Sequence, residues 1–150
     1  ERIQGDMVPM NHIIEYDLKH SPGDYYLQTH STNPLLSKKS LKEGIKTYFS
    51  MTDRFDSVFS VTRWQNRLYW PSGKPINHNP KELIRTQDLD PVYEENSNFY
   101  IFSKESFKRA GNSRIGLTPK MFIIDKIEAI DIDEDQDFYI AEAVYRMKHG

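Results

Sequence analysis

The chain has 150 residues, enough for one domain with a single hydrophobic core. Hydrophobic residues make up 37% and charged residues 28%, which is typical of a globular protein and argues against long disorder. A formal net charge of −2 excludes a global positive field that would recruit nucleic acid or an anionic membrane, and the absence of cysteine excludes disulfides and thiolate zinc sites. The apolar runs are too short to cross a bilayer, so a cytoplasmic location is expected.

Helices and strands alternate in the first part of the chain. Apolar residues at helical spacing predict helices at residues 8–19 and 37–49. Residues 25–28 are expected to form a short buried strand, and residues 57–61 a second strand. Because a strand, a crossover helix and a further strand form a right-handed parallel unit, these two strands are expected to run in parallel.

Residues 62–93 have a different pattern, in which basic residues alternate with aromatic and aliphatic ones around a tight turn at residues 71–74. The pattern predicts a long, hairpin-like excursion. Such an excursion cannot bury both of its faces alone, so it is expected to pack on a partner such as an identical subunit. An RNA-binding arm is the alternative, since aromatic and basic side chains together can stack on bases. The chain as a whole is not basic, which disfavours that alternative.

The last part of the chain again alternates strands and helices. Residues 98–102 and 121–124 are predicted strands, and a short helix with Ser103 as its N-cap is expected after the first of them. A final helix is predicted at residues 134–148, acidic at its start and basic at its end. The alternation predicts an α/β sandwich.

Five acidic residues lie within residues 129–137, namely Asp131, Asp133, Glu134, Asp135 and Asp137. In an extended segment Asp131 and Asp133 would project to one face while the neighbouring isoleucines face the core. A hard cation such as Mg²⁺, which takes oxygen ligands, would relieve the repulsion between two such carboxylates. The alternative is that the acids start a helix and complement its dipole. We favour helix initiation for the last three and leave both interpretations open for Asp131 and Asp133.

Several well-known signatures are absent from the sequence. It contains no dinucleotide-binding glycine fingerprint, no Walker loop and no zincin motif. The five histidines share no metal-ligand spacing. Only His30 lies on a polar loop that follows a predicted strand, where open α/β sheets bind ligands.

Four blocks occur in a characteristic order: residues 27–35, 57–62, 93–102 and 130–133. Together they resemble the acylneuraminate cytidylyltransferase family, and the chain resembles its C-terminal portion. The resemblance implies transfer of CMP from CTP to the anomeric hydroxyl of a 2-keto-3-deoxy sugar acid, with release of pyrophosphate. It also implies a Rossmann-like three-layer sandwich with a mainly parallel sheet and a protruding dimerisation hairpin at residues 62–93.

The resemblance also assigns roles to individual residues. Asp131 and Asp133 match the Asp-x-Asp pair that binds the essential Mg²⁺ and are expected to be catalytic. Gln28 matches a substrate-binding glutamine, whose amide offers both a donor and an acceptor to a polyhydroxylated ligand. Tyr100 matches an aromatic residue that lines the sugar pocket, although ordinary core packing of a strand aromatic is the strong alternative.

Two basic residues of the excursion are expected to act on the neighbouring subunit of a homodimer. By resemblance Arg85 would hold the sugar carboxylate, which a planar guanidinium can bind with two hydrogen bonds. Lys81 is a second candidate cation. The alternative for Arg85 is a solvated surface charge.

The sequence departs from the family pattern in two places. The glycine-rich and basic nucleotide-binding loop of the family is not in this chain, so by itself the chain is expected to be incomplete and inactive. Where sialic-acid-specific members place paired aromatics, this chain has Arg114-Ile115-Gly116, which leaves the sugar open. The alternatives are a non-catalytic sugar-acid-binding or dimerisation fragment, and a sugar nucleotidyltransferase that uses another nucleotide.

Overall fold

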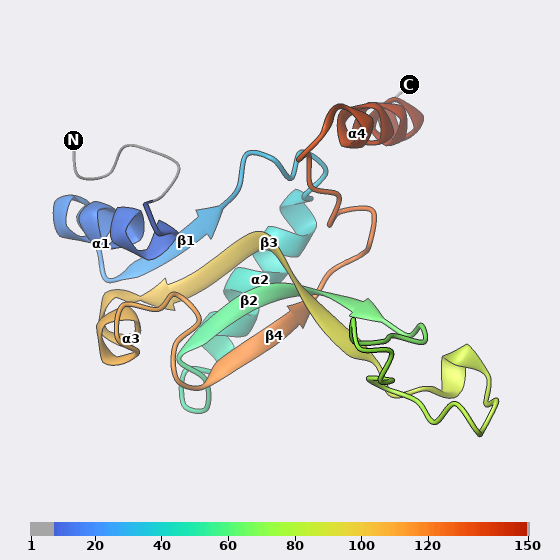
Figure 1. Ribbon diagram of the computed structural model, residues 1–150. Helices are drawn as coiled ribbons and strands as arrows, with labels where there is room; N and C mark the ends of the chain where they lie inside the picture. Colours follow the sequence, from blue (N-terminus) through green and yellow to red (C-terminus); the bar gives the residue numbers. More distant parts are fainter. Residues whose placement is uncertain (1–7, 150) are drawn as a thin grey trace.

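The computed structural model describes residues 8–149 (Figure 1). Its elements in chain order are α1 (Met10–His20), β1 (Tyr25–Thr29), α2 (Lys38–Ser50), β2 (Ser57–Trp64), the 3₁₀ helix η1 (Thr86–Asp88), β3 (Val92–Ser103), α3 (Lys104–Arg109), β4 (Pro119–Ile123) and α4 (Asp135–His149). Each predicted helix and strand is present, with its bounds shifted or extended. Among the described helices, none has the length and apolarity that crossing a bilayer requires.

The four strands form one mixed sheet in the order β1-β3-β2-β4. β3 pairs antiparallel with β1 and with β2, whereas β2 and β4 pair in parallel. The prediction of a mainly parallel sheet is therefore wrong as regards strand pairing, because only β2 and β4 pair in parallel. The strands β1, β2 and β4 nevertheless run in the same direction. The physical reason is that β2 and β3 are joined as a long hairpin, so they pair antiparallel and β3 separates β1 from β2.

Helices cover both faces of the sheet, as the α/β sandwich predicts. One buried cluster contains Ile14, Leu18, Tyr100, Phe102 and Phe107, and the other contains Tyr48, Val58, Phe99, Ile101 and Ile124. Alternate residues of β3 therefore face α1 and α3 on one side and α2 on the other, as the period of a strand requires. The central strand β3 contributes to both cores, which explains why it is almost fully buried between Asn98 and Phe102.

Local sequence signals account for the helix starts. Ser37 accepts a hydrogen bond from the Ser40 backbone N–H at the start of α2. Ser103, the predicted N-cap of α3, forms a reciprocal capping box with Ser106.

The prediction that β1 is a buried strand is wrong, because β1 lies at the sheet edge and exposes Tyr25 and Leu27.

The predicted excursion projects away from the sheet at the lower right of Figure 1. We call residues 65–91 the arm; at its base Trp64 of β2 pairs with Val92 of β3. The Asn77 side chain holds the arm together, since it accepts from the Leu68 N–H and donates to the Asp90 carbonyl. Leu83 of the arm is 87% exposed. An interface role for the arm stays a prediction.

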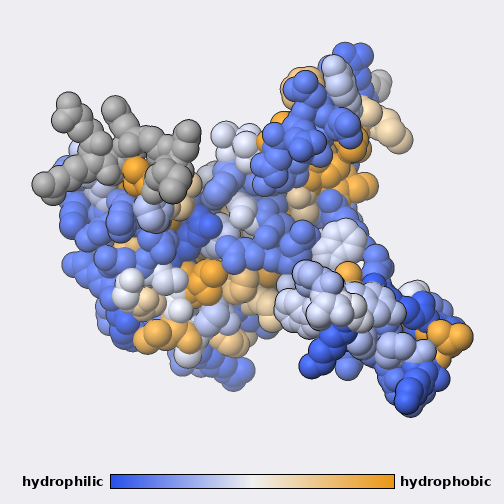
Figure 2. All heavy atoms as spheres, viewed as in Figure 1, coloured by the Kyte–Doolittle hydropathy of each residue, from blue (hydrophilic) through white to orange (hydrophobic). Residues whose placement is uncertain are grey.

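The last helix, α4, stands away from the sheet in Figure 1. Of its residues only Ala141 is buried, while several apolar side chains along the helix are exposed. Figure 2 shows hydrophobic residues at the surface beside this helix and at the tip of the arm.

Candidate functional site

The site begins where the edge strand β1 ends. Gln28 of β1 is the direct cross-strand partner of Tyr100 of β3, so both side chains project from the same face of the sheet. One residue later, Thr29 pairs with Phe99 and the strand stops. The polar loop with His30 starts at this point.

A bulge in β3 places the Glu95 carboxylate next to the Tyr100 hydroxyl. Phe59 pairs with Tyr100 and Val61 with Glu95, so four residues of β3 oppose a single residue of β2. Within the bulge Ser97 has a φ of +58°. The Tyr100 hydroxyl consequently donates a hydrogen bond to Glu95, five residues earlier in the chain.

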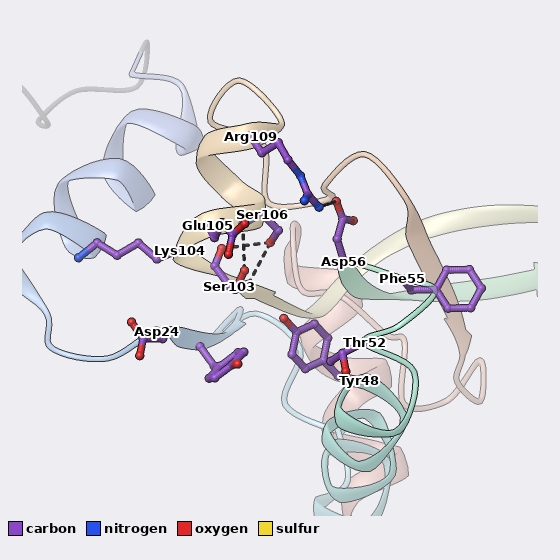
Figure 3. A pocket seen from close by; sticks show the side chains of 11 residues that line it. Asp24, Tyr48, Thr52, Phe55, Asp56, Ser103, Lys104, Glu105, Ser106 and Arg109 are labelled. Carbon is purple, nitrogen blue, oxygen red and sulfur yellow. Dashed lines mark hydrogen bonds and ion pairs between the residues drawn. The ribbon is translucent and has the colours of Figure 1, made fainter.

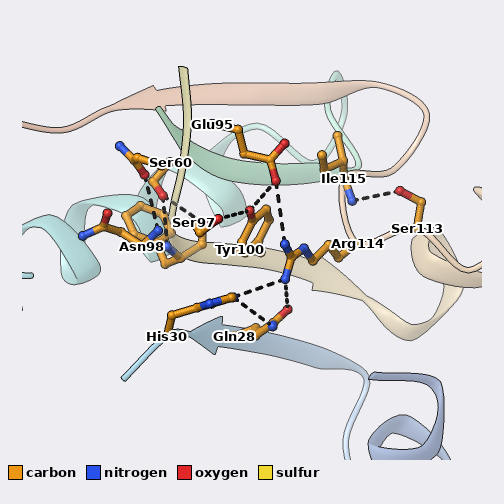
Figure 4. Close-up of polar contacts among 12 residues, drawn as sticks. Gln28, His30, Ser60, Glu95, Ser97, Asn98, Tyr100, Ser113, Arg114 and Ile115 are labelled. Carbon is orange, nitrogen blue, oxygen red and sulfur yellow. Dashed lines mark hydrogen bonds and ion pairs between the residues drawn. The ribbon is translucent and has the colours of Figure 1, made fainter. Parts of the chain in front are cut away.

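Arg114 joins these groups from the loop between α3 and β4 (Figure 4). Its Nη1 donates to Gln28 Oε1 at 3.0 Å, and its Nη2 lies 3.7 Å from Glu95 Oε1. The guanidinium carbon sits 3.6 Å from the centre of the Tyr100 ring, a stacked cation–π contact. We call Gln28, His30, Glu95, Tyr100 and Arg114 the polar cluster.

The backbone around Arg114 is fixed by its neighbours. Ile115 packs against the buried cluster beside α1 and α3. Gly116 has a φ of +77°, and a Cβ atom added there would lie 2.2 Å from Asp56 Oδ1. The Asp56 carboxylate also accepts hydrogen bonds from the backbone N–H groups of Leu117 and Thr118, both at 3.0 Å. The loop that carries Arg114 therefore requires a glycine at position 116.

The cluster shifts the ionisation of two of its members. Burial, followed by the charge of Arg114, lowers the pKa of His30, while Asp131 opposes this shift. Burial and the hydrogen bond to Glu95 raise the pKa of Tyr100 to about 12. The Tyr100 ring is fully buried beneath Arg114, so a ligand approaching this face would meet Arg114 first.

The segment with the predicted metal-binding pair runs beside the loop that follows β1. The Ile132 N–H donates to the Thr32 carbonyl at 2.9 Å, and Asn33 Nδ2 donates to the Ile130 carbonyl at 3.4 Å. Asp131 Oδ1 and Asn33 Oδ1 are both buried and have no hydrogen-bond partner within residues 8–149. A buried oxygen without a donor is costly, and a cation or an ordered water would relieve that cost.

The residues present fit a magnesium ion in part. Within the described part of the chain, no three metal-ligating side chains gather closely enough to form a site on their own. Mg²⁺ needs fewer, since it commonly binds one or two carboxylates and completes its shell with waters and phosphate oxygens. Asp131 offers its unpartnered oxygen, and the Asp133 side chain is exposed and free to turn.

Asp137 supports the start of α4, as the helix-initiation interpretation of the sequence predicted. Its carboxylate accepts hydrogen bonds from the backbone N–H groups of Asp133 at 3.1 Å and Glu134 at 2.9 Å. These bonds satisfy donors that precede α4 and fix the end of the acidic segment.

The two predicted cations of the arm lie apart from this site within the chain. Arg85 pairs with Asp88 through two hydrogen bonds of 2.7 and 3.2 Å, and its side chain is 73% exposed. Lys81, also in the arm, is exposed. The structure therefore brings Gln28 and Tyr100 together through Arg114 and places Asp131 close enough to act on His30 of the same cluster. It places Arg85 and Lys81 on the arm, and the roles of all these residues stay predictions.

A separate cavity of about 390 Å³ lies where β1 and β2 begin, at the ends of these strands that are far from the polar cluster (Figure 3). Tyr48, Asp56, Ser103 and Arg109 are among its lining residues, and Arg109 donates to Asp56 at 3.1 Å. It shares no lining residue with the polar cluster.

Sequence reasoning did not identify Glu95 and treated Arg114 only as a departure from the family pattern. Neither residue follows a spacing rule with the other members of the cluster. The contact between them depends on the β3 bulge and on the loop closed by Gly116. The positive φ at Ser97 leaves no recognisable signal in the sequence.

Comparison with known proteins gives the chain its context. It is 32% identical over 139 residues to N-acylneuraminate cytidylyltransferase A of Danio rerio, a match that covers 87% of this chain and 31% of that protein. The chain resembles part of an acylneuraminate cytidylyltransferase. It is also 29% identical to N-acylneuraminate cytidylyltransferase of Oncorhynchus mykiss, over 79% of this chain and 28% of that protein. The resemblance drawn from the four sequence blocks is thereby confirmed.

Two further comparisons broaden this result. Post-translational flagellin modification protein B of Campylobacter coli is 24% identical over 84% of this chain and 54% of its own length. The crystal structure of 4-diphosphocytidyl-2C-methyl-D-erythritol synthase from Anaerococcus prevotii superposes with a TM-score of 0.63 at 12% identity, over 93% of this chain and 67% of that one. The chain shares the fold of that synthase. No family model matches the sequence.

The chain spans about a third of the two neuraminate relatives and about half of the flagellin-modification protein. Any activity of a whole acylneuraminate cytidylyltransferase is therefore a proposal for this chain.

Proposed function

We propose that the chain forms the sugar-acid-binding and metal-binding part of a cytidylyltransferase. The reaction would transfer CMP from CTP to the anomeric hydroxyl of a 2-keto-3-deoxy sugar acid and release pyrophosphate. The names of the relatives support the class of reaction. The observation that carries the proposal is the buried, unpartnered oxygen of Asp131, held beside the loop that follows β1.

Asp131 and Asp133 would hold Mg²⁺ at this position. When bound there, the ion would neutralise negative charge on the CTP phosphates, which phosphoryl-type transfer requires. Asn33 supports the arrangement, because its side chain holds the Ile130 carbonyl one residue before Asp131. Second contacts of this kind orient metal ligands in proteins.

Gln28 would contact the sugar acid from the end of β1. Its Oε1 accepts a hydrogen bond from Arg114, and its amide nitrogen is hydrogen-bonded to His30 Nε2 at 3.4 Å, so the second N–H of the amide is the donor that it would offer to a hydroxyl. Tyr100 would support the site from below rather than touch the sugar, because Arg114 covers its ring.

The arm would complete the site in a second copy of the chain. Arg85 and Lys81 lie on the projecting arm, away from their own acidic segment, and Arg85 holds Asp88 in the two-bond geometry that a substrate carboxylate would also accept. A homodimer in which each arm reaches its partner would bring these cations to the sugar carboxylate.

Manganese provides a direct test, because Mn²⁺ replaces Mg²⁺ at oxygen sites and broadens nearby amide signals in NMR spectra. Added to the ¹⁵N-labelled chain, Mn²⁺ is expected to broaden the signals of residues 28–33 and 130–133 first. Asp131→Asn should remove this effect. Asp135→Asn, which changes an exposed acid a few residues later, is the matched control and should leave it intact. Broadening that survives in Asp131→Asn, or that centres on residues 134–137, would overturn the metal assignment.

A further inference from the structure

The arm exposes a leucine on a well-supported stretch of backbone. Leu83 is 87% exposed and lies at the centre of a γ-turn, in which the Ile84 N–H donates to the Glu82 carbonyl at 3.0 Å. The arm holds this turn in place, since Arg67 Nη2 donates to the Ile84 carbonyl at 2.5 Å. On the other side of the turn, Asn79 Nδ2 donates to the Glu82 carboxylate at 3.1 Å. The exposed leucine therefore projects from a surface of defined shape.

An apolar groove beside α4 has the complementary shape. We call it the α4 groove; apart from Glu142, it is lined by Pro34, Leu35, Ile132, Phe138, Ala141 and Tyr145. Leu35 and Ala141 are buried and form its floor, whereas Phe138 and Tyr145 are each more than half exposed. The groove measures about 200 Å³, below the range of roughly 300 to 1,000 Å³ that is typical of small-molecule sites. It therefore suits a single aliphatic side chain better than a cofactor.

The charges around the two features are complementary. Residues 131–142, which border the α4 groove, contain six acidic residues and no basic one. Lys81 and Arg85 lie two residues to either side of Leu83, and both are exposed. A leucine between two cations therefore matches an apolar groove bordered by carboxylates, and such charge complementarity steers association and disfavours other partners.

The α4 groove also lies beside the proposed metal site. Ile132, which lines the groove, directly follows Asp131 in the chain. Arg85 follows Leu83 by two residues, a span of roughly 7 Å in an extended chain. The backbone of Arg85 is extended, with φ −64° and ψ 148°. A leucine seated in the groove would thus carry Arg85 of the same arm toward the site around Asp131.

The leucine that fills the groove must come from another molecule. Within one chain the arm and α4 project from different parts of the sheet (Figure 1), and hydrophobic residues of both lie at the surface in Figure 2. An exchange between two copies would cover both surfaces at once. Because each copy offers one leucine and one groove, two such contacts would be related by a two-fold axis, as in most homodimers.

We propose that the α4 groove is the docking site for Leu83 of a second copy of this chain. The inference rests on the proposed function, in which the arm of one subunit reaches the site of its partner. It names the surface that receives the arm and the side chain that anchors it there.

Two complementary substitutions test the fit by sedimentation equilibrium. Leu83→Ala shortens the projecting side chain, and Ala141→Leu fills the groove from its floor. Each is expected to weaken dimerisation at least about tenfold, the first through lost apolar contact and the second through steric exclusion. Combined in one chain, they should restore the dimer affinity to within about threefold of the wild type, because the longer side chain at position 141 occupies the space left at position 83. A substitution that merely damaged the fold would not be rescued in this way.

Disulfide trapping locates the contact independently, since the chain contains no cysteine of its own. Chains with Leu83→Cys are mixed with chains with Tyr145→Cys and oxidised, and we expect a cross-linked pair because the two positions would come within disulfide distance. Leu117→Cys, at a residue 60% exposed on the loop before β4, is the matched control for Leu83→Cys and should give only background cross-linking.

Three results would overturn the inference and leave the proposed function standing. They are a dimer that neither single substitution weakens, a double variant that dimerises no better than the single ones, and cross-linking of Leu83→Cys no greater than that of the control. Preferential cross-linking of Tyr145→Cys chains to one another would also overturn it, because two α4 helices would then cover each other. The proposed function fails on a different readout, namely the absence of manganese broadening at residues 130–133 of the wild-type chain.

Discussion

Gly116 shows how a single residue positions the polar cluster. Its backbone needs a positive φ, and the Asp56 carboxylate occupies the space that a side chain would fill. Gly116→Ala is therefore expected to destabilise the chain by more than about 2 kcal/mol, measured by urea unfolding. Gly73 has nearly the same φ, +79°, but open space around it, so Gly73→Ala should cost only about 1 kcal/mol. Equal effects of the two substitutions would show that Asp56 imposes no steric constraint.

Asp56 also makes stability depend on pH. Burial alone would raise its pKa, but the N–H groups of Leu117 and Thr118 and the Arg109 guanidinium outweigh burial and lower it. A carboxyl whose pKa is lower in the folded state stabilises the fold above the pKa of the unfolded chain, about 3.9, and loses this effect as the pH falls further. The difference in unfolding free energy between the wild type and Asp56→Asn should therefore be about 1 to 3 kcal/mol at pH 7 and shrink below pH 4.

The matched control for this pH profile is Asp53→Asn. Asp53 is exposed, and its substitution should change stability by less than about 0.5 kcal/mol at either pH. A pH-independent difference for Asp56→Asn would contradict the assignment.

At the level of elements, two connections meet at the site. The loop after β1 and the acidic segment are joined by the Asn33 side chain and by the hydrogen bond from Ile132 to Thr32. Asn33→Ala should release the acidic segment, with about tenfold faster hydrogen exchange at the Ile132 amide and about tenfold weaker Mn²⁺ binding. Asn79→Ala, in the arm, removes a side-chain contact to Glu82 and should change neither quantity. Unchanged hydrogen exchange at the Ile132 amide in Asn33→Ala would show that Asn33 does not hold the acidic segment in place.

The elements themselves could be predicted because their signals are local. Helical spacing and the Ser103 cap located α2 and α3, and apolar runs located all four strands. The strand order could not be predicted, because it depends on β3 pairing with both β1 and β2 across long stretches of chain. The same holds at the site. The Asp131 segment is visible as a sequence pattern, whereas the contact of Arg114 with Glu95 depends on a bulge and a loop that form only in the fold.

At the scale of the whole molecule, the arm carries apolar residues that are exposed among residues 8–149. Leu83 is 87% exposed, so Leu83→Asp should leave the fold intact. If the arm docks on a second copy, this substitution should weaken the dimer at least about tenfold in sedimentation, because it places a charge in an apolar contact. Leu117→Asp, on a loop away from the arm, is the control. A wild-type chain that sediments as a monomer at working concentration would contradict the dimer and, with it, the action of Arg85 on a neighbour.

We propose that this chain carries the sugar-acid and metal site of a cytidylyltransferase. It is tested most directly by pyrophosphate release from CTP and Mg²⁺ with a panel of 2-keto-3-deoxy sugar acids, using the chain alone and combined with the nucleotide-binding segment that the family resemblance implies. We expect release when that segment is present, with a loss of at least about 100-fold in Asp131→Asn and little change in Asp135→Asn. No release from the folded, complemented chain with any of these acids, or full activity in Asp131→Asn, would contradict the account.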